Sequence, residues 1–225
     1  MSPTEKPRKR VSNPPQKLQK TSRKWMYIAL VLIVVVIAVG AYVILRNPSS
    51  SSQKNTSPSG YPIAVINTTM GTIKVELYTD KMPITTANFI KLINDGFYSG
   101  LVFHRVMHNF MIQGGGFYPN GTQKQDPYGT IKLETSPDVL HVDGAISMAR
   151  LSTPADSATS QFFICDGAQT SLDGQYAAFG KVIDGMDVVR AIAALDPAQT
   201  TTKYGSYQNW PVNDIIINSI TIVSS

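Results

Sequence analysis

Residues 103–116, FHRVMHNFMIQGGG, hold the side chains best suited to chemistry, because an arginine, two histidines and a glutamine stand within an apolar run. On one straight strand Arg105 would share a face with Phe103, and it would lie about 26 Å from Gln113 at roughly 3.3 Å per residue. The arginine and the glutamine could not then serve one site. A bend at residues 108–109 would instead pair the two halves and bring four side chains together: Arg105, Phe110, Met111 and Gln113. The pattern predicts a hairpin with a polar edge and an apolar wall; the alternative is a surface arginine on an ordinary strand.

Other chemistries fit these residues less well. His104 and His108 have a spacing that could bind a metal from a helix, but on a strand they would lie about 13 Å apart. A serine hydrolase needs a histidine base, an orienting carboxylate and a nucleophile turn, and no such turn pattern surrounds a serine near either histidine or near His141. Cys165 lies within the apolar run QFFIC, which indicates a buried thiol. We therefore expect neither a metal nor a cofactor.

Strands and two helices must position the hairpin. Residues 63–78, IAVINTTMGTIKVELY, have two β-branched halves around a Met-Gly pair and predict a first hairpin, and residues 214–223, DIIINSITIV, predict a final strand. Helices are expected over residues 83–94 and 186–195, which are bounded by proline and glycine signals. Many strands with two isolated helices predict a mainly β fold, a closed barrel plugged by the helices.

A long apolar run precedes this domain. Residues 25–45, WMYIALVLIVVVIAVGAYVIL, contain no charge, and at about 1.5 Å per residue they can cross the roughly 30 Å hydrocarbon core of a bilayer. We therefore predict a single transmembrane helix. The alternatives are a buried helix and a cleaved signal peptide, since residues 38–40, Ala-Val-Gly, are similar to a cleavage site, although the apolar run continues past them.

Charge is distributed unevenly around this span. Residues 1–24 carry eight Lys or Arg and one Glu, whereas Arg46 alone is basic directly after the span. The positive-inside rule therefore predicts that residues 1–24 are cytoplasmic and that the C-terminal domain is extracytoplasmic. Residues 46–60, RNPSSSSQKNTSPSG, have almost nothing to bury and predict a flexible linker.

Residues 61–225 have the composition of a globular domain. The chain of 225 residues is 43% hydrophobic, which is enough for one sizeable core plus an appendage. From Tyr61 onward, ten basic and fourteen acidic residues leave a net charge of −4, which argues against a nucleic-acid surface. The single cysteine excludes an intrachain disulfide, so packing alone must stabilise the domain.

Four segments, in order, resemble motifs of the cyclophilin family of peptidyl-prolyl cis/trans isomerases: FHRVMHNFMIQGG (103–115), GAISMAR (144–150), SATSQFFIC (157–165) and LDGQYAAFGKVIDGMDVV (172–189). With the first hairpin and the final strand, the resemblance extends over roughly residues 62–223. SMAR and DSATSQFF are similar to prokaryotic members more than to the animal cytosolic type. The resemblance implies an eight-stranded antiparallel β-barrel closed by two α-helices, with the active groove on its outer face.

The resemblance also implies roles for individual residues. Arg105 matches the catalytic arginine, Phe110 the floor of the proline pocket, and Gln113 the side chain that holds the substrate backbone. Of the two adjacent phenylalanines at 162 and 163, alternation lets one face the groove, and the resemblance selects Phe163. The remaining pocket and groove positions are matched by His104, Met111, Ala149, Gln161 and Leu172.

Two positions depart from the family pattern. Where many members have Trp-Leu-Asp-Gly-Lys-His, residues 171–176 read SLDGQY. Ser171 lacks the tryptophan that contributes to cyclosporin binding, and Tyr176 keeps an aromatic wall of the pocket but changes its polar end. We therefore expect catalysis to persist and cyclosporin binding to be weakened.

The expected activity is isomerisation of X-Pro bonds in proline-containing polypeptides, which would assist protein folding outside the cytoplasmic membrane. No nucleophile is required, because a dry pocket and one well-placed donor can favour the twisted amide. The main alternative is a membrane-tethered module that binds proline-containing segments without useful catalysis. A third is a structural membrane protein whose domain merely displays a barrel.

Overall fold

The computed structural model describes residues 60–196, 203–204 and 209–223. The predicted basic segment and transmembrane helix, and the predicted linker up to residue 59, lie outside the described residues. Within the described part of the chain, no helix is long and apolar enough to cross a membrane.

Eight strands form one antiparallel sheet in the order β3-β4-β6-β5-β7-β2-β1-β8. The predicted first hairpin is confirmed, because its two strands pair from Ile63↔Glu76 to Thr68↔Gly71. The predicted final strand is also confirmed, although it begins at Ile217. The strands are β1 Ile63–Thr68, β2 Gly71–Leu77, β3 Phe103–Met107, β4 Met111–Gly114, β5 Ala145–Met148, β6 Phe162–Cys165, β7 Ala178–Asp184 and β8 Ile217–Val223.

The expectation of a closed barrel is corrected to a half-barrel. The edge strands β3 and β8 are not joined by a continuous ladder, and one isolated bridge, Val102↔Ile216, links the residues beside them. Further along, the free edge of β3 is occupied by the loop that precedes β8, since Val106 N donates to Asn209 O at 2.9 Å. The two edges therefore meet at one end only.

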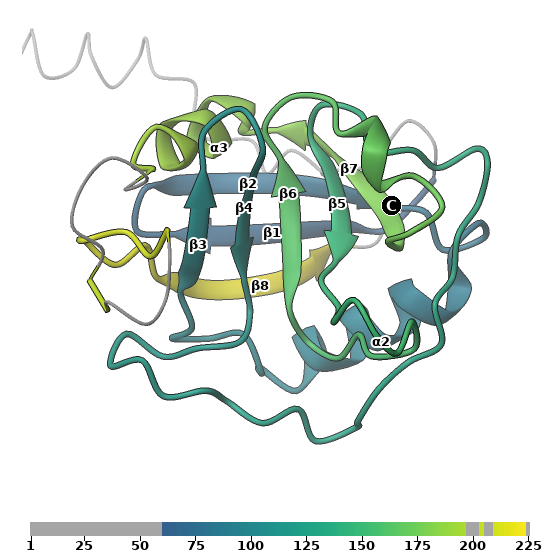
Figure 1. Ribbon diagram of the computed structural model, residues 1–225, viewed down its shortest axis with the longest axis horizontal. Helices are drawn as coiled ribbons and strands as arrows, with labels where there is room; N and C mark the ends of the chain where they lie inside the picture. The colour runs from purple at the N-terminus through teal and green to yellow at the C-terminus, as the bar shows by residue number, and fades with distance from the viewer. Residues whose placement is uncertain (1–59, 197–202, 205–208, 224–225) are drawn as a thin grey trace, which may run out of the picture. The chain divides into compact units, whose positions relative to one another are not determined.

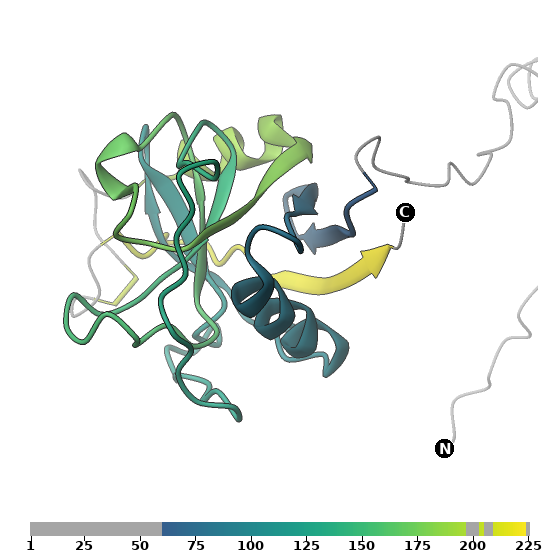
Figure 2. The ribbon, with the colours of Figure 1, turned by 90° about the vertical axis from the view of Figure 1, so that its right-hand side faces the viewer.

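The strands are arranged as two layers with the core between them. In Figure 1, β3, β4, β6 and β5 cross in front of β1, β2 and β8, and α2 and α3 lie at opposite ends. Figure 2 shows α2 beside β8. Phe89 of α2 is fully buried and packs its ring against Phe162 of the front layer at 5.3 Å and Phe179 at 5.1 Å. Aromatic contacts thus link a helix to the sheet.

Both predicted helices are confirmed. α2 spans Pro83–Asn94, and its first-turn proline lacks only an N–H that would be unpaired there. α3 spans Met186–Ala193, two residues shorter than predicted. Gly185 caps the N-terminus of α3 with φ of 89°, and a Cβ there would lie 2.3 Å from Thr72 O, so no other residue fits between α3 and β2.

Candidate active site

The predicted bend in residues 103–116 is confirmed as the turn between β3 and β4. Arg105 pairs with Gln113, and Met107 with Met111. Asn109 stands at the turn with φ of 57°, and the buried carboxylate of Asp166 accepts its N–H at 2.8 Å. The turn is therefore held by the residue directly after β6, the strand that carries Phe163.

A β-bulge at His104 sets which side chains face outward. Phe103 pairs with Gly114 and Arg105 with Gln113, which leaves His104 as the extra residue of β3. Phe103 consequently points into the core, where it packs against Phe162 at 5.9 Å, while Arg105 points out. A straight strand would have put Phe103 and Arg105 on one face, so the bulge separates core from site.

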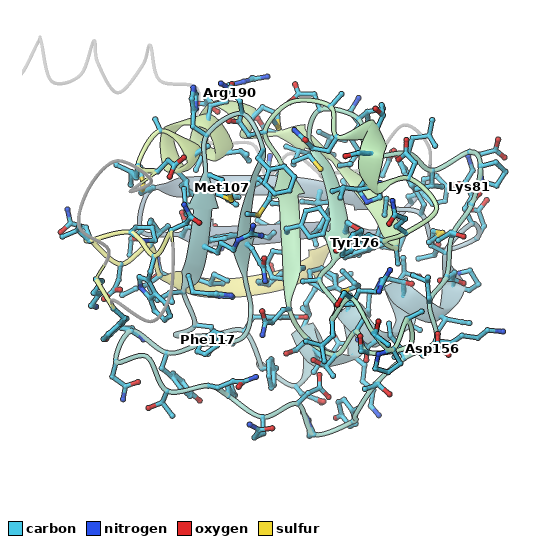
Figure 3. The ribbon with its side chains drawn as sticks, viewed as in Figure 1. Lys81, Met107, Phe117, Asp156, Tyr176 and Arg190 are labelled. Atoms are coloured by element: carbon cyan, nitrogen blue, oxygen red, sulfur yellow. The ribbon has the colours of Figure 1, made fainter. Side chains whose placement is uncertain are left out.

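The outer face of β3, β4, β6 and β5 holds a hollow with an apolar wall. Figure 3 shows Tyr176 over this front layer. Phe163 is 5% exposed and belongs to this wall, whereas Phe162 belongs to the main core, as the alternation along β6 requires. The hollow is lined by Arg105, Phe110, Met111, Gln113, Ala149, Arg150, Phe163, Leu172 and Tyr176. Eight of the ten predicted site residues therefore converge.

Arg105 forms the cationic edge of the hollow. Its Nη1 donates to Gln113 Oε1 at 3.3 Å, and its Cζ lies 5.7 Å from the centre of the Phe110 ring. Burial lowers the pKa of the Arg105 guanidinium, but an arginine remains charged at physiological pH. Within the described residues no carboxylate pairs with it. The charge is thus left to act on whatever enters the hollow.

Gln161 and His104 lie behind Gln113. Gln113 Nε2 donates to Gln161 Oε1 at 3.0 Å, and the side chain of Gln161 also hydrogen-bonds to His104. Gly116 makes room for this arrangement, because a Cβ there would lie 2.6 Å from Gln161 Cδ. Hydrogen bonds thus connect four side chains in series: His104, Gln161, Gln113 and Arg105.

His104 does not reach the hollow, unlike the direct substrate contact implied by the resemblance. It is 6% exposed and packs against Phe117 at 4.6 Å and Trp210 at 5.8 Å. Burial lowers the pKa of His104 to about 4, so its imidazole is neutral at physiological pH. The bulge turns this side chain inward, and its contact with the site runs through Gln161.

His141 supports the pocket wall from beneath. Its Nδ1 lies 2.8 Å from Asp173 Oδ1 and its Nε2 lies 3.0 Å from Ser147 Oγ, while its ring stacks on Phe163 at 6.0 Å. The order Asp-His-Ser is that of a hydrolase triad, but Ser147 is fully buried and cannot reach a substrate. Sequence reasoning missed this cluster, since its members are brought together only where the loop before β5 meets the loop after β6, as in the bond from Gln169 N to His141 O.

Cys165 has the inert environment that its sequence context predicted. The thiol is buried, and burial raises the pKa of Cys165 to about 12. A thiol at that pKa stays protonated and is a poor nucleophile.

Arg150 was not assigned a role from the sequence, although it follows Ala149 directly. Its Nε donates to Gln175 O at 2.7 Å, and its Cζ lies 4.9 Å from the centre of the Tyr176 ring. It thereby ties the end of β5 to the segment that carries Tyr176. The sequence signal for such a role was the position of Arg150, a charged residue directly after one matched to the groove.

These parts can anchor an apolar ring and present a fixed hydrogen-bond donor beside it. Dispersion contacts with Phe110, Met111 and Phe163 suit a compact apolar ring, and the guanidinium suits an atom that gains electron density. None of these lining residues is a nucleophile activated by a base. The arrangement is therefore suited to a conformational change of a bound group.

Comparison with known proteins finds relatives by sequence and by structure. Residues 63–222 match the family model of the cyclophilin type peptidyl-prolyl cis-trans isomerase/CLD. A peptidyl-prolyl cis-trans isomerase of Acinetobacter baylyi is 45% identical over 164 residues, 71% of this chain and 84% of that protein. Peptidyl-prolyl cis-trans isomerase B of Escherichia coli is 38% identical over 170 residues, 71% of this chain and 99% of that protein. A cyclophilin type isomerase of Cryptosporidium parvum, solved in the presence of the dipeptide Ala-Pro, has a TM-score of 0.62 at 32% identity, covering 72% of this chain and 99% of that one.

Proposed function

This chain belongs to the cyclophilin-type peptidyl-prolyl cis-trans isomerase family, and we propose that Arg105 catalyses rotation about X-Pro bonds whose proline ring lies in the adjoining hollow. The activity itself is that of the family, and relatives at 38–45% identity carry its name. The observation that carries the proposal is the position of Arg105 at the edge of an apolar hollow, with no carboxylate partner among the residues that the structure describes.

The energetic requirement is moderate. Rotation about a peptide C–N bond costs about 18–20 kcal/mol because resonance is lost. A turnover of about 10³ per second corresponds to a barrier near 13 kcal/mol, so the site must supply roughly 5–7 kcal/mol. Fixed electrostatics of this kind can supply several kcal/mol.

Arg105 can favour the twisted state over both planar states. When the amide twists, the proline nitrogen regains a lone pair and becomes a hydrogen-bond acceptor. A planar amide nitrogen offers this far less, so a guanidinium N–H aimed at it stabilises the transition state more than the ground state. Because Gln113 holds the guanidinium through Nη1, the remaining N–H groups are available to substrate.

The other residues bind and orient the substrate in this proposal. Gln113 holds a substrate backbone group. Gln161 orients Gln113, and His104 acts behind both. The proline ring packs against Phe110, Met111, Phe163, Leu172 and Tyr176, with Ala149 at the side of the groove. The Ala-Pro dipeptide present with the Cryptosporidium protein supports proline-containing polypeptides as the ligand class.

An exchange assay on the full chain in mild detergent tests this function. Cis-trans exchange of a short X-Pro peptide is followed by NMR with wild-type protein and with Arg105→Ala. Acceleration by the wild type together with its loss in the variant is the expected result. Binding of the peptide without faster exchange would instead indicate a binding module.

We also propose that the enzyme is tethered to the cytoplasmic membrane with its isomerase domain outside. The uncharged run 25–45, the basic segment before it and the Ser/Pro-rich residues after it support this topology. Relatives from Acinetobacter and Escherichia support a bacterial-type protein. A domain so placed would assist newly exported chains, since uncatalysed X-Pro isomerisation takes tens to hundreds of seconds.

Protease accessibility tests the topology. In intact spheroplasts, an externally added protease should digest the domain from Tyr61 onward. Protection of the domain until the membrane is lysed would place it on the cytoplasmic side and would overturn the tethering proposal without affecting the catalytic one.

A further inference from the structure

Two hollows lie next to each other on the outer face of the front strands. The first is the proline-sized hollow described above, and the second is lined by Gln113, Gln123, Ala149, Arg150, Leu151, Ser157, Thr159 and Gln161. Three residues line both: Gln113, Ala149 and Arg150. A peptide with its proline in the first hollow must therefore pass Arg150 if its neighbouring residues reach the second.

The Arg150 guanidinium is held in one place by uncharged partners. Besides its bond to Gln175 O, it donates from Nη1 to Leu151 O at 2.6 Å and to Ser152 O at 3.0 Å. One face lies against the Tyr176 ring. A cation that is already fixed loses little conformational entropy when it pairs with a ligand.

Among the described residues, no acidic side chain forms a salt bridge with Arg150. Neither hollow has an Asp or Glu in its lining. The carboxylate of Asp173, two residues before Gln175, is bonded to the backbone N and the ring Nδ1 of His141. Arg150 and Arg105 therefore make the groove positive, although residues 61–225 carry a net charge of −4.

We propose that Arg150 is a specificity-determining residue that favours substrates with an acidic side chain close to the isomerised proline. The proposal rests on the isomerase function and on the groove passing from one hollow to the other. A substrate carboxylate beside a fixed guanidinium gains a charge-assisted contact, while a lysine at the same place is repelled. We expect a preference of about 2- to 5-fold in kcat/KM at low salt, the size typical of a partly exposed ion pair.

The direct test needs only the wild-type chain. Peptides with one X-Pro bond carry Glu, Gln or Lys at one position at a time, from three residues before the proline to two after it, and exchange is measured by NMR in mild detergent. Glu should exceed Gln, and Gln should exceed Lys, at one or two positions. The preference should shrink toward unity at about 0.5 M salt, where the Debye length is only a few ångströms.

Variants then assign the preference to one residue. In Arg150→Gln the ratio of Glu to Gln peptides should fall to about one, whatever happens to the absolute rates, and in Arg150→Lys it should stay above one. Arg190→Gln is the matched control: Arg190 pairs with Asp143 at 2.7 Å and lies on α3, away from Tyr176 (Figure 3), so it should keep the wild-type ratio.

The outcomes separate this inference from the function on which it rests. If the wild type accelerates the Gln peptide but no position distinguishes Glu from Gln, the inference is wrong and the isomerase stands. The inference is also wrong if Arg150→Gln keeps the full preference. If the wild type accelerates none of the peptides, both are overturned.

Discussion

Arg105 and Gln113 face each other across the β3-β4 hairpin, and the guanidinium Nη1 donates to Gln113 Oε1 at 3.3 Å. The same glutamine donates to Gln161 from its amide nitrogen. Each member of this series orients the next, so residues that touch no substrate atom can still affect the position of the catalytic donor.

Gly116→Ala should lower activity without unfolding the protein. The added Cβ would lie 2.6 Å from both Cδ and Nε2 of Gln161, and this flexible side chain must move away. Loss of its bond to Gln113 should reduce kcat/KM by about 3- to 10-fold, the value of one hydrogen bond. NMR exchange and thermal unfolding of the variant measure the two effects separately.

A double-mutant cycle shows whether Gly116 acts through Gln161. Gln161→Ala alone should give a similar loss, and adding Gly116→Ala to it should change little. Losses that simply multiply in the double variant would contradict the role given to Gly116.

Protonation of His104 should make stability depend on pH between about 6.5 and 4. The pKa of His104 is about 4 in the folded protein, against 6.5 for a free imidazole. The unfolded chain therefore takes up a proton first as the pH falls, and the folded state loses up to about 3 kcal/mol over this window. Urea unfolding at pH 7, 5.5 and 4.5 measures the change.

His104→Gln isolates this contribution because glutamine does not titrate. The difference in unfolding free energy between wild type and variant should decline as the pH falls from 7 to 4.5. The carboxylates titrate in both proteins, so their effects cancel in this difference. A difference that stays constant with pH would be incompatible with a buried neutral His104.

Glu134 should stabilise α2 from a distance. Met82 offers no side-chain cap, and the Glu134 carboxylate instead accepts from Ile84 N at 3.2 Å, Thr85 N at 2.9 Å and Thr85 Oγ1 at 2.8 Å. Glu134→Ala should cost about 1–2 kcal/mol of unfolding free energy, as loss of a helix cap does. Chemical denaturation measures this cost, and kcat/KM should stay near wild type.

Asp138→Ala provides the control for Glu134. It removes the same charge from the same segment, but the Asp138 carboxylate makes no side-chain hydrogen bond or ion pair among the described residues. Equal destabilisation by the two variants would show that charge, and not capping, is responsible.

Ser171→Trp should strengthen inhibition by cyclosporin. Ser171 is exposed in the short 3₁₀ turn Thr170–Leu172, beside the pocket residue Leu172. An aromatic side chain adds contact area there, and about tenfold tighter inhibition corresponds to about 1.4 kcal/mol. Inhibition curves for wild type, Ser171→Ala and Ser171→Trp test this. Inhibition of the wild type as strong as that of Ser171→Trp would refute the weakening expected from the sequence.

Local patterns were enough to predict the elements. The β-branched runs within residues 63–78 predicted a hairpin. The strand pattern and the Met-Gly turn both depend on residues that are close together in the sequence. The helix signals at Pro83 and Gly96 likewise predicted α2, because they also act locally. The bend at 108–109 followed from the need to bring Arg105 and Gln113 together.

Features that depend on distant partners were not predicted. The bulge at His104 reverses the side on which Phe103 lies, and it is set by pairing with β4 rather than by residue type. In the half-barrel, the edge of β3 bonds to the loop before β8 through Val106 N and Asn209 O, residues about a hundred positions apart in the sequence. The His141 cluster and the role of Arg150 likewise require knowing which loop covers β5.

The central claim is that Arg105 stabilises the twisted X-Pro amide. The decisive measurement is kcat/KM for NMR-monitored exchange of an X-Pro peptide by the full chain, compared among wild type, Arg105→Ala and the distant control Arg190→Ala, with thermal unfolding recorded for each. Arg105→Ala should lose about 10²- to 10³-fold in kcat/KM, the effect of removing one preorganised donor, while it unfolds at the wild-type temperature and Arg190→Ala keeps its activity. A folded Arg105→Ala variant with near wild-type kcat/KM would contradict the claim.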